Sequence, residues 1–317
     1  MFYIDQSSTD LLIAKDEHYR NLRYIIKKKL QGNNFAENHP QGLTKRIRQV
    51  SGIHSNVYNF FKDENNLKDI LIGTPDILNG YKGMFKTKKE KKGVRSLLNY
   101  IGFIDKRVDS TFGFYNAFDL ARNLNIRTCV YCNRLYTDTV ITERGEKIMR
   151  PTFDHWFPKE EFPLLSLSFY NLIPSCSICN TSIKGSQSNS LDQFFHPYLK
   201  HTNSDMRLDF NFSYLLNSMN SAQCRVISKN AFSEHSVKAM RLEEMYGSHG
   251  QEINDLILLK RAYSSSYMQS LNSILKVNLS SDEIYRLAFG TYIQEEELIK
   301  RPISKLKRDI LIELGII

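Results

Sequence analysis

The chain is 317 residues long, with an apolar fraction of 41% and a formal net charge of +9. This length is enough for two or three compact domains. The sequence has no apolar run near the roughly 18 residues that cross a bilayer, and residues 1–10 lack the pattern of a secretory signal. These features argue against a membrane protein and predict a cytoplasmic one.

The first 120 residues (1–120) are predicted to form a helical, basic domain. Ser8 is placed to cap a helix that runs to Lys29 and ends before Gly32. Residues 32–42 are expected to form a loop. Further helices are predicted at residues 44–61, 94–106 and 114–124.

The positive charge is concentrated in this region. Residues 1–128 hold 22 Lys and Arg against 13 Asp and Glu, whereas the rest of the chain holds 21 of each. Such asymmetry indicates a surface that faces a polyanion, and a nucleic acid is the first choice. The densest stretch lies between Lys82 and Arg95, although a charge run taken alone favours a solvated, mobile loop.

Residues 121–200 have a different composition, and we expect them to form a separate core with β structure. Residues 135–142 are rich in β-branched and aromatic side chains, and a glycine-containing turn can lead back into residues 147–153. This hairpin would end in Asp154-His155. A second extended stretch is expected at residues 164–173.

Helical periodicity returns in residues 201–317, which we predict to form a helical C-terminal domain. One helix is expected over residues 252–275. Ser280 and Glu283 have the spacing of a capping box for the next helix. A final helix is expected at residues 304–314, ended by the glycine that follows it.

Four of the five cysteines occur in two C-x-x-C pairs, Cys129/Cys132 and Cys176/Cys179. Two such pairs can close a tetrahedral structural zinc site, whereas disulfides are rare in the cytosol. The pairs are separated by 43 residues, more than the usual spacing of about 15–20, so we expect an insertion with its own function. The alternative is two unrelated buried pairs. The fifth cysteine, Cys224, is expected to be a buried apolar residue.

The segment around and between the cysteine pairs carries an ordered set of motifs. The chain supplies C-V-Y-C, F-D-H-W-F-P-K, Y-N-L-I-P-S and C-S-I-C-N-T-S-I-K in that order. Asn171 follows His155 after 15 residues, and Asn180 follows Asn171 after eight more. In this order of motifs, residues 129–187 resemble the HNH nuclease family, which has a cysteine pair, an Asp-His dyad, a central Asn and a second cysteine pair followed by Asn or His.

The resemblance implies an α+β protein. Its central ββα-metal core would be closed by the four-cysteine zinc site and flanked by mostly α-helical N- and C-terminal regions. Asn171 is then expected to brace the loop that holds His155. Asn180 takes the place of the histidine that gives the family its last letter, which leaves the preferred catalytic metal open.

Phosphodiester hydrolysis requires an activated water and stabilisation of the developing negative charge. The neutral imidazole of His155 is the proposed general base. Asp154 and Asn180 are the proposed ligands of one divalent ion, Mg²⁺ or Mn²⁺, which hard oxygen donors favour. The expected substrate is DNA, with RNA as an open alternative, and the family implies 3′-hydroxyl and 5′-phosphate products.

Two lysines are candidates for contacts with the phosphate backbone. Lys184 lies one helical turn beyond Asn180, and Lys159 follows the Asp-His dyad. Plain solvent exposure is the alternative for Lys184. For Asn180 the alternative is a helix cap beside Cys179.

Other functions remain open at the level of sequence. One is a non-catalytic module in which the zinc knuckle and the basic region hold nucleic acid without cutting it, although such a module has no need of Asp154-His155. Another is a docking protein whose helical flanks bind a partner. HNH effectors of bacterial anti-phage systems have similar flanks, so an ATPase or sensor partner, a homo-oligomer and the bacterial cytosol are expectations from the resemblance.

Overall fold

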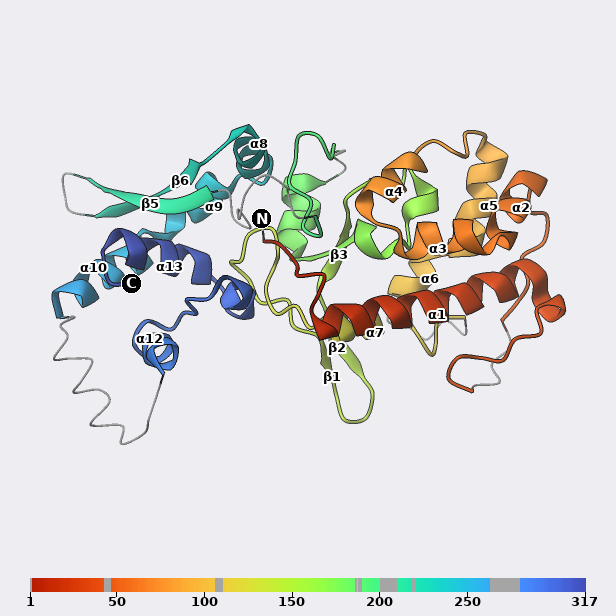
Figure 1. Ribbon diagram of the computed structural model, residues 1–317, viewed down its shortest axis with the longest axis horizontal. Coiled ribbons are helices and arrows are strands. Elements are labelled where there is room, and N and C mark those ends of the chain that lie inside the picture. Colours follow the sequence, from red (N-terminus) through yellow and green to blue (C-terminus); the bar gives the residue numbers. More distant parts are fainter. Residues whose placement is uncertain are drawn as a thin grey trace.

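Helical segments lie on both sides of a central region with short strands (Figure 1). The computed structural model describes residues 2–42, 47–105, 111–185, 187, 190–199, 210–217, 221–262 and 280–317. Within these residues the strands pair in three antiparallel two-stranded sheets, so the mixed α+β class is confirmed. In the part of the chain that the structure describes, no helix is long and apolar enough to cross a membrane.

The N-terminal region consists of short helices around one long helix. α1 (Thr9–Gln31) begins where the Ser8 hydroxyl accepts a hydrogen bond from the Leu11 amide. It ends at Gly32, whose φ of +58° disfavours any residue with a side chain. The predicted helix and both of its ends are confirmed. The remaining elements of this region are η1 (Gly32–Asn34), α2 (Ser55–Lys62), α3 (Glu64–Ile72), α4 (Pro75–Gly80), α5 (Lys88–Leu98), α6 (Tyr100–Ile104) and α7 (Ala117–Leu124).

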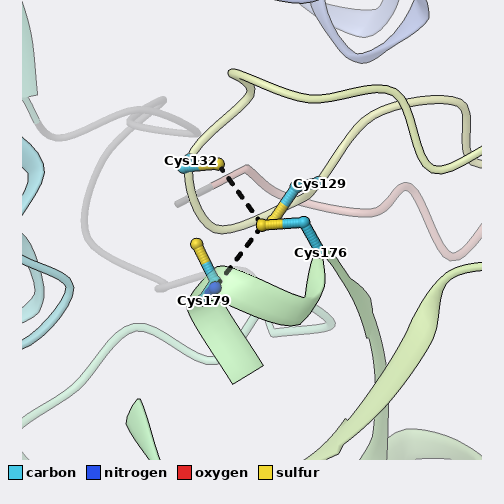
Figure 2. Close-up of side chains that lie close together, drawn as sticks. All are labelled: Cys129, Cys132, Cys176 and Cys179. Carbon is cyan, nitrogen blue, oxygen red and sulfur yellow. Dashed lines mark hydrogen bonds between the residues drawn. The ribbon is translucent and has the colours of Figure 1, made fainter. Parts of the chain in front are cut away.

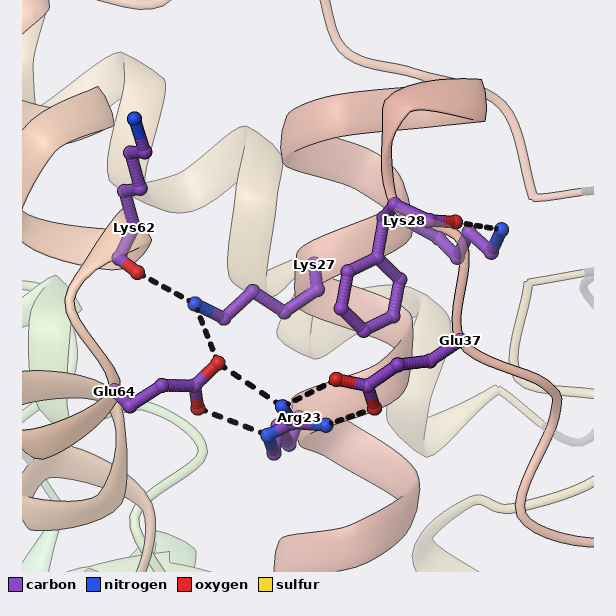
Figure 3. A network of polar contacts seen from close by, with 7 residues as sticks. Arg23, Lys27, Lys28, Glu37, Lys62 and Glu64 are labelled. Carbon is purple, nitrogen blue, oxygen red and sulfur yellow. Dashed lines mark hydrogen bonds and ion pairs between the residues drawn. The ribbon is translucent and has the colours of Figure 1, made fainter.

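An ion-pair network fixes α1 against the start of α3. Figure 3 shows Arg23 between two carboxylates, 2.5 Å from Glu37 and 2.9 Å from Glu64. The buried Lys27 ammonium donates to the Glu64 carboxylate at 2.9 Å and to the Lys62 carbonyl at 2.6 Å. These two cations therefore serve the fold, so the net charge of the region overstates the positive charge that is free for a polyanion.

The predicted helix at residues 44–61 is confirmed over residues 55–61 and wrong over residues 47–54. α2 begins only at Ser55, where His54 caps it, and residues 47–54 are not helical. Residues 43–46 lie outside the described residues. The helix expected at 114–124 is confirmed but begins at Ala117, because the residue before it provides the capping box.

The helix expected at residues 94–106 begins earlier, as α5, and ends at Leu98. Thr87 and Glu90 form a capping box that the prediction missed, and this box starts the helix at Lys88. Asn99, with φ of +48°, separates α5 from α6. The densest part of the basic stretch is therefore helical, and the reading of it as a solvated loop is wrong.

The central region contains two of the small sheets and a short helix. The predicted hairpin forms, although its strands are shorter than expected, and β3 ends with Asp154-His155 as predicted. In the second sheet Asp154 lies opposite Ile173, and His155 lies opposite Leu172. The elements are β1 (Val140–Ile141), β2 (Lys147–Met149), β3 (Thr152–His155), η2 (Pro163–Leu165), η3 (Phe169–Asn171), β4 (Leu172–Ser175) and η4 (Ile178–Lys184), of which η4 is a π-helix.

The extended stretch expected at residues 164–173 is wrong except at its end. The chain makes two 3₁₀ turns, η2 and η3, and β4 begins only at Leu172. Nearly every residue from 163 to 175 is buried. Because the segment is buried on all sides, its apolar residues show neither the period of two of a strand nor any other period. The sequence pattern therefore could not distinguish turns from a strand.

The C-terminal region contains a hairpin that the sequence analysis did not predict. β5 and β6 pair over seven residues each and contact α10 and α13. The Ser280–Glu283 capping box and the final helix are confirmed, whereas residues 263–275 of the helix expected at 252–275 lie outside the described residues. The elements are β5 (Phe210–Leu216), β6 (Ala222–Ser228), α8 (Ala231–Ala239), α9 (Leu242–Tyr246), η5 (Gly247–His249), α10 (Gly250–Ala262), α12 (Ser281–Phe289), η6 (Glu295–Lys300) and α13 (Ser304–Glu313).

The buried His18 connects α1 to the loop between β3 and β4. Its Nε2 donates to the Leu167 carbonyl at 2.7 Å, so its Nδ1 accepts from the Tyr115 hydroxyl at 3.0 Å. Burial lowers the pKa of His18 to about 4, whereas an unfolded chain has a histidine pKa of about 6.5. The unfolded state therefore binds more protons between these values, and stability falls as pH falls through this window.

We predict that His18 makes the protein less stable by about 2 kcal/mol at pH 5 than at pH 7. Urea unfolding of wild type and of His18→Gln at both pH values measures this contribution. The variant is expected to be less stable at pH 7 but to lose less stability on acidification. Equal losses in both proteins would contradict the assignment.

Candidate functional site

The four paired cysteines converge from two distant segments. Cys129 and Cys132 lie on the loop after α7, and Cys176 and Cys179 lie where β4 meets η4 (Figure 2). All four are buried, and their sulfur atoms lie within 4.8 Å of one another. The Cys179 amide donates to the Cys176 sulfur at 3.4 Å, and the Arg134 amide donates to the Cys132 sulfur at the same distance.

This geometry fits a closed tetrahedral metal site. Zinc–sulfur bonds of about 2.3 Å place ligand sulfurs about 3.8 Å apart, and Cys132 and Cys176 are 4.0 Å apart. Four thiols with no other ligand type select zinc over hard cations. The predicted cluster is confirmed as a set of residues that can hold zinc. The fifth cysteine, Cys224, is buried on β6, apart from the cluster, as predicted.

The carboxylate of Asp154 is buried and bound on both oxygens. Oδ2 accepts a hydrogen bond from the Tyr131 hydroxyl at 2.5 Å, and Oδ1 accepts from the Lys184 ammonium at 3.0 Å. Burial raises the pKa of Asp154, and the nearby Lys184 charge opposes that shift. Tyr131 lies between the first two cysteines, so the sulfur cluster and Asp154 are connected through one side chain.

Lys184 is not the exposed phosphate contact that the sequence suggested. Its side chain is 2% exposed, and its ammonium binds both Asp154 and the His155 carbonyl, the latter at 2.8 Å. The prediction failed because helical spacing gives the face of a residue but not what covers that face. Plain solvent exposure, the alternative reading, is also wrong.

The imidazole of His155 is held in one orientation. Its Nε2 lies 2.9 Å from the Ser166 carbonyl, which only accepts, so Nε2 carries the proton. The Nδ1 atom then has the free lone pair. The Tyr100 ring packs edge-on against the imidazole, with the ring centroids 4.5 Å apart. Burial lowers the pKa of His155 to about 3, so the ring is neutral at pH 7.

Asn171 braces the loop that follows His155. Its Oδ1 accepts from the Phe157 amide at 2.7 Å, and its Nδ2 donates to the carbonyls of Phe157 and Leu165 at 3.1 and 2.8 Å. The side chain is fully buried. Three bonds from one amide thus tie the two ends of the loop together and keep the Ser166 carbonyl beside His155.

Asn180 lies inside η4 and does not cap it, so the helix-cap alternative is wrong. The cap position is Ser177, and the Asn180 carbonyl accepts from the Gly185 amide across a π-turn. Asn180 precedes Lys184 by four residues in this π-helix, follows Cys179 directly and is half-buried. An amide and a carboxylate are hard donors that fit Mg²⁺ or Mn²⁺, although Lys184 competes for one oxygen of Asp154.

Lys159 stays near the imidazole. Its ammonium lies 3.2 Å from the Glu160 carboxylate and 5.8 Å from the centre of the Tyr100 ring. Trp156, the next residue after the dyad, is fully buried against His196 and therefore packs beneath the loop.

Sequence reasoning missed the roles of Tyr131 and Tyr100. Tyr131 lies between Cys129 and Cys132 in the sequence. When the four cysteines come together, this loop lies beside Asp154, so a contact of Tyr131 with Asp154 could have been suspected. No local signal pointed to Tyr100, which is 55 residues from His155 in the chain.

Comparison with models of protein families, with curated protein sequences and with solved structures finds no match. A neutral imidazole with a free Nδ1, a buried carboxylate and an amide on the adjacent helix can together support proton transfer and a hard cation.

We predict that Cys176→Ser abolishes binding of zinc, which the wild type holds at about one equivalent. Loss of a structural metal typically lowers the free energy of unfolding by more than about 4 kcal/mol. Elemental analysis of purified protein and thermal unfolding measure the two effects. Cys224→Ala is the matched control and is expected to retain zinc; a metal-free wild type purified with zinc present would contradict the site.

Replacing Lys184 with Met should leave the buried Asp154 charge without a partner. Breaking a buried ion pair in this way costs about 3–5 kcal/mol. We expect Mg²⁺ or Mn²⁺ to restore part of that stability in the variant, because the ion can take the place of the ammonium. Denaturant unfolding with and without each ion tests this, and Lys238→Met, at an exposed surface pair, is the control. A Lys184 variant as stable as the control would refute the prediction.

Proposed function

We propose that this protein is a metal-dependent endonuclease of the HNH type that hydrolyses DNA phosphodiester bonds. The observation that carries the proposal is the imidazole of His155. It lies at the end of β3 beside Asp154, its Nε2 is committed to the Ser166 carbonyl, and its Nδ1 is available as a base. His18 is also held in one tautomer, but its Nδ1 accepts a hydrogen bond from the Tyr115 hydroxyl, whereas Nδ1 of His155 has no hydrogen-bond partner among the described residues.

In this mechanism Nδ1 of His155 accepts the proton of the attacking water. The Nε2 bond to Ser166 keeps the ring oriented, and the Asn171 bonds keep the loop around that carbonyl in place. Tyr100 covers one edge of the ring and limits its rotation. The chain therefore supplies a base whose direction is set before substrate arrives.

Asp154 and Asn180 would hold the divalent ion. When bound, such an ion polarises the scissile phosphate and stabilises the leaving oxygen. Tyr131 fixes the position of the carboxylate through Oδ2. Lys184 supplies positive charge at Oδ1, so it sets how strongly an added cation must compete for that oxygen.

A second function, nucleic-acid binding without cleavage, is supported by the buried ion pair between Asp154 and Lys184. The charge of Asp154 is already matched by Lys184 in a buried site, as it would be if the carboxylate only stabilised the fold. A protein that only binds nucleic acid does not require the fixed orientation of His155, so we rank binding alone below hydrolysis.

We predict that wild-type protein nicks or linearises plasmid DNA with Mg²⁺ or Mn²⁺, and that His155→Ala cuts about 10²–10⁴ times more slowly, the usual cost of losing a general base. His235→Ala is the control, because His235 is exposed on α8 in the C-terminal region. Both variants should bind DNA as the wild type does, at matched zinc content.

Two results would overturn the nuclease proposal. The first is a wild type that binds DNA but does not cut it with any divalent ion, which leaves the binding module as the function. The second is cleavage that persists at the wild-type rate in His155→Ala, which would place the activity in another site or another protein.

A further inference from the structure

The helix α5 divides into a buried face and a cationic face. Glu90, Val94, Leu97 and Leu98 are buried, with the period of an inward-facing stripe. The opposite face is exposed and carries no acidic or aromatic side chain; its basic residues are Lys88, Lys89, Lys92 and Arg95. α5 itself lies among the other helices of the N-terminal region (Figure 1).

The charge on this face is not neutralised by the protein. The one acid of the helix, Glu90, is turned inward, where it bonds to Thr87 and Asn56. In the described ranges of the chain, Lys88, Lys89 and Lys92 form no ion pair, in contrast to the paired cations of α1. Like charges at i and i+4 destabilise a helix, so a bound polyanion would relieve a repulsion that the fold leaves in place.

α5 is also joined to the loop that holds the imidazole. The Arg95 guanidinium donates to the Glu160 carbonyl at 3.1 Å, and the Lys91 ammonium donates to the Glu161 carbonyl at 3.4 Å. Shortly after α5 ends, Tyr100 packs against His155, with Lys159 beside it. Direct contacts therefore connect the cationic face of α5 to His155, the proposed general base.

The spacing of the cations suits a nucleic-acid strand. Lys88, Lys92 and Arg95 follow one another at i, i+4 and i+7, a row about 10 Å long at 1.5 Å per residue. Phosphates along one strand of a duplex advance about 3.4 Å per nucleotide, so the row covers about three nucleotides. A face without aromatic side chains has no means of stacking on bases, which points to backbone contacts.

We propose that the exposed face of α5 binds the phosphate backbone of duplex DNA and leads one strand to His155. The second half of this statement rests on the proposed function, whereas the binding itself does not. The contacts are to phosphates, so the surface adds affinity for any sequence and selects none.

The test is DNA binding by the double variant Lys88→Gln/Lys92→Gln. Glutamine removes the charge and keeps the helix propensity. Fluorescence anisotropy with two duplexes of unrelated sequence, without divalent ions and across a salt series, gives the slope of log affinity against log salt. We expect the magnitude of that slope to fall by about two, roughly one unit for each phosphate that the protein no longer neutralises, equally for both duplexes.

The matched control is Arg225→Gln/Lys260→Gln, which removes the same charge at exposed positions on β6 and α10. Equal reductions of the slope in the two double variants would overturn the proposal in favour of a general charge effect. Tighter binding of RNA than of DNA with the same length and sequence would overturn the assignment to DNA.

Plasmid cleavage by the same proteins separates the two proposals. If Lys88→Gln/Lys92→Gln binds DNA with the affinity and salt slope of the wild type and still cuts, the α5 proposal is overturned and the nuclease proposal is supported. Weakened binding in that variant, with a wild type that never cuts, would support the α5 surface and overturn the nuclease.

Discussion

The rest of the structure depends on the loop that carries the first cysteine pair, Cys129 and Cys132. Its Val130 carbonyl accepts from the Phe2 amide at 2.8 Å, and its Cys132 carbonyl accepts from the Tyr246 hydroxyl at 2.5 Å. Asn133 bonds to the carbonyls of Leu298 and Arg301. The N-terminal segment, the central region and the C-terminal helices thus meet at one loop whose shape the four sulfurs set. A metal there would hold together far more than its own ligands.

The same loop reaches the polar site through Tyr131, and this connection explains why the site can be buried. A carboxylate such as that of Asp154 is costly to remove from water unless its oxygens are bound. Here one oxygen has a hydroxyl donor and the other has an ammonium donor. Each donor sits on a segment that also carries two of the cysteines, so the sulfur cluster and the carboxylate position each other.

Local signals predicted the parts of the molecule that local energetics decide. The Ser8 cap, the Ser280 capping box and the strand that ends with His155 were each readable from a few neighbouring residues. The four cysteines were readable because two C-x-x-C pairs are the usual ligand pattern of a structural zinc site. Their convergence is confirmed by the geometry, although the resemblance that suggested the nuclease chemistry stays a prediction.

Several misses share one cause, which is that tertiary contacts decided them; the start of α5 differs, because its capping box is a local signal that the prediction missed. Lys184 was placed on the right side of its helix, but its partner lies 30 positions earlier. Tyr100 reaches His155 from the end of a helix whose start was itself misplaced. The β5–β6 hairpin is stabilised by α13, where Asp309 accepts from the Phe212 amide, and strand periodicity alone did not reveal it.

The π-turn of η4 limits how the length of this segment can change. The bond from the Gly185 amide to the Asn180 carbonyl, 3.0 Å long, spans one residue more than an α-helical bond. That residue sets the rotation between Cys179, which faces the sulfurs, and Lys184, which faces Asp154. Deleting one residue would restore α-helical geometry and swing the ammonium about 100° from the carboxylate. A one-residue deletion here is therefore expected to break the Lys184–Asp154 ion pair without replacing either residue.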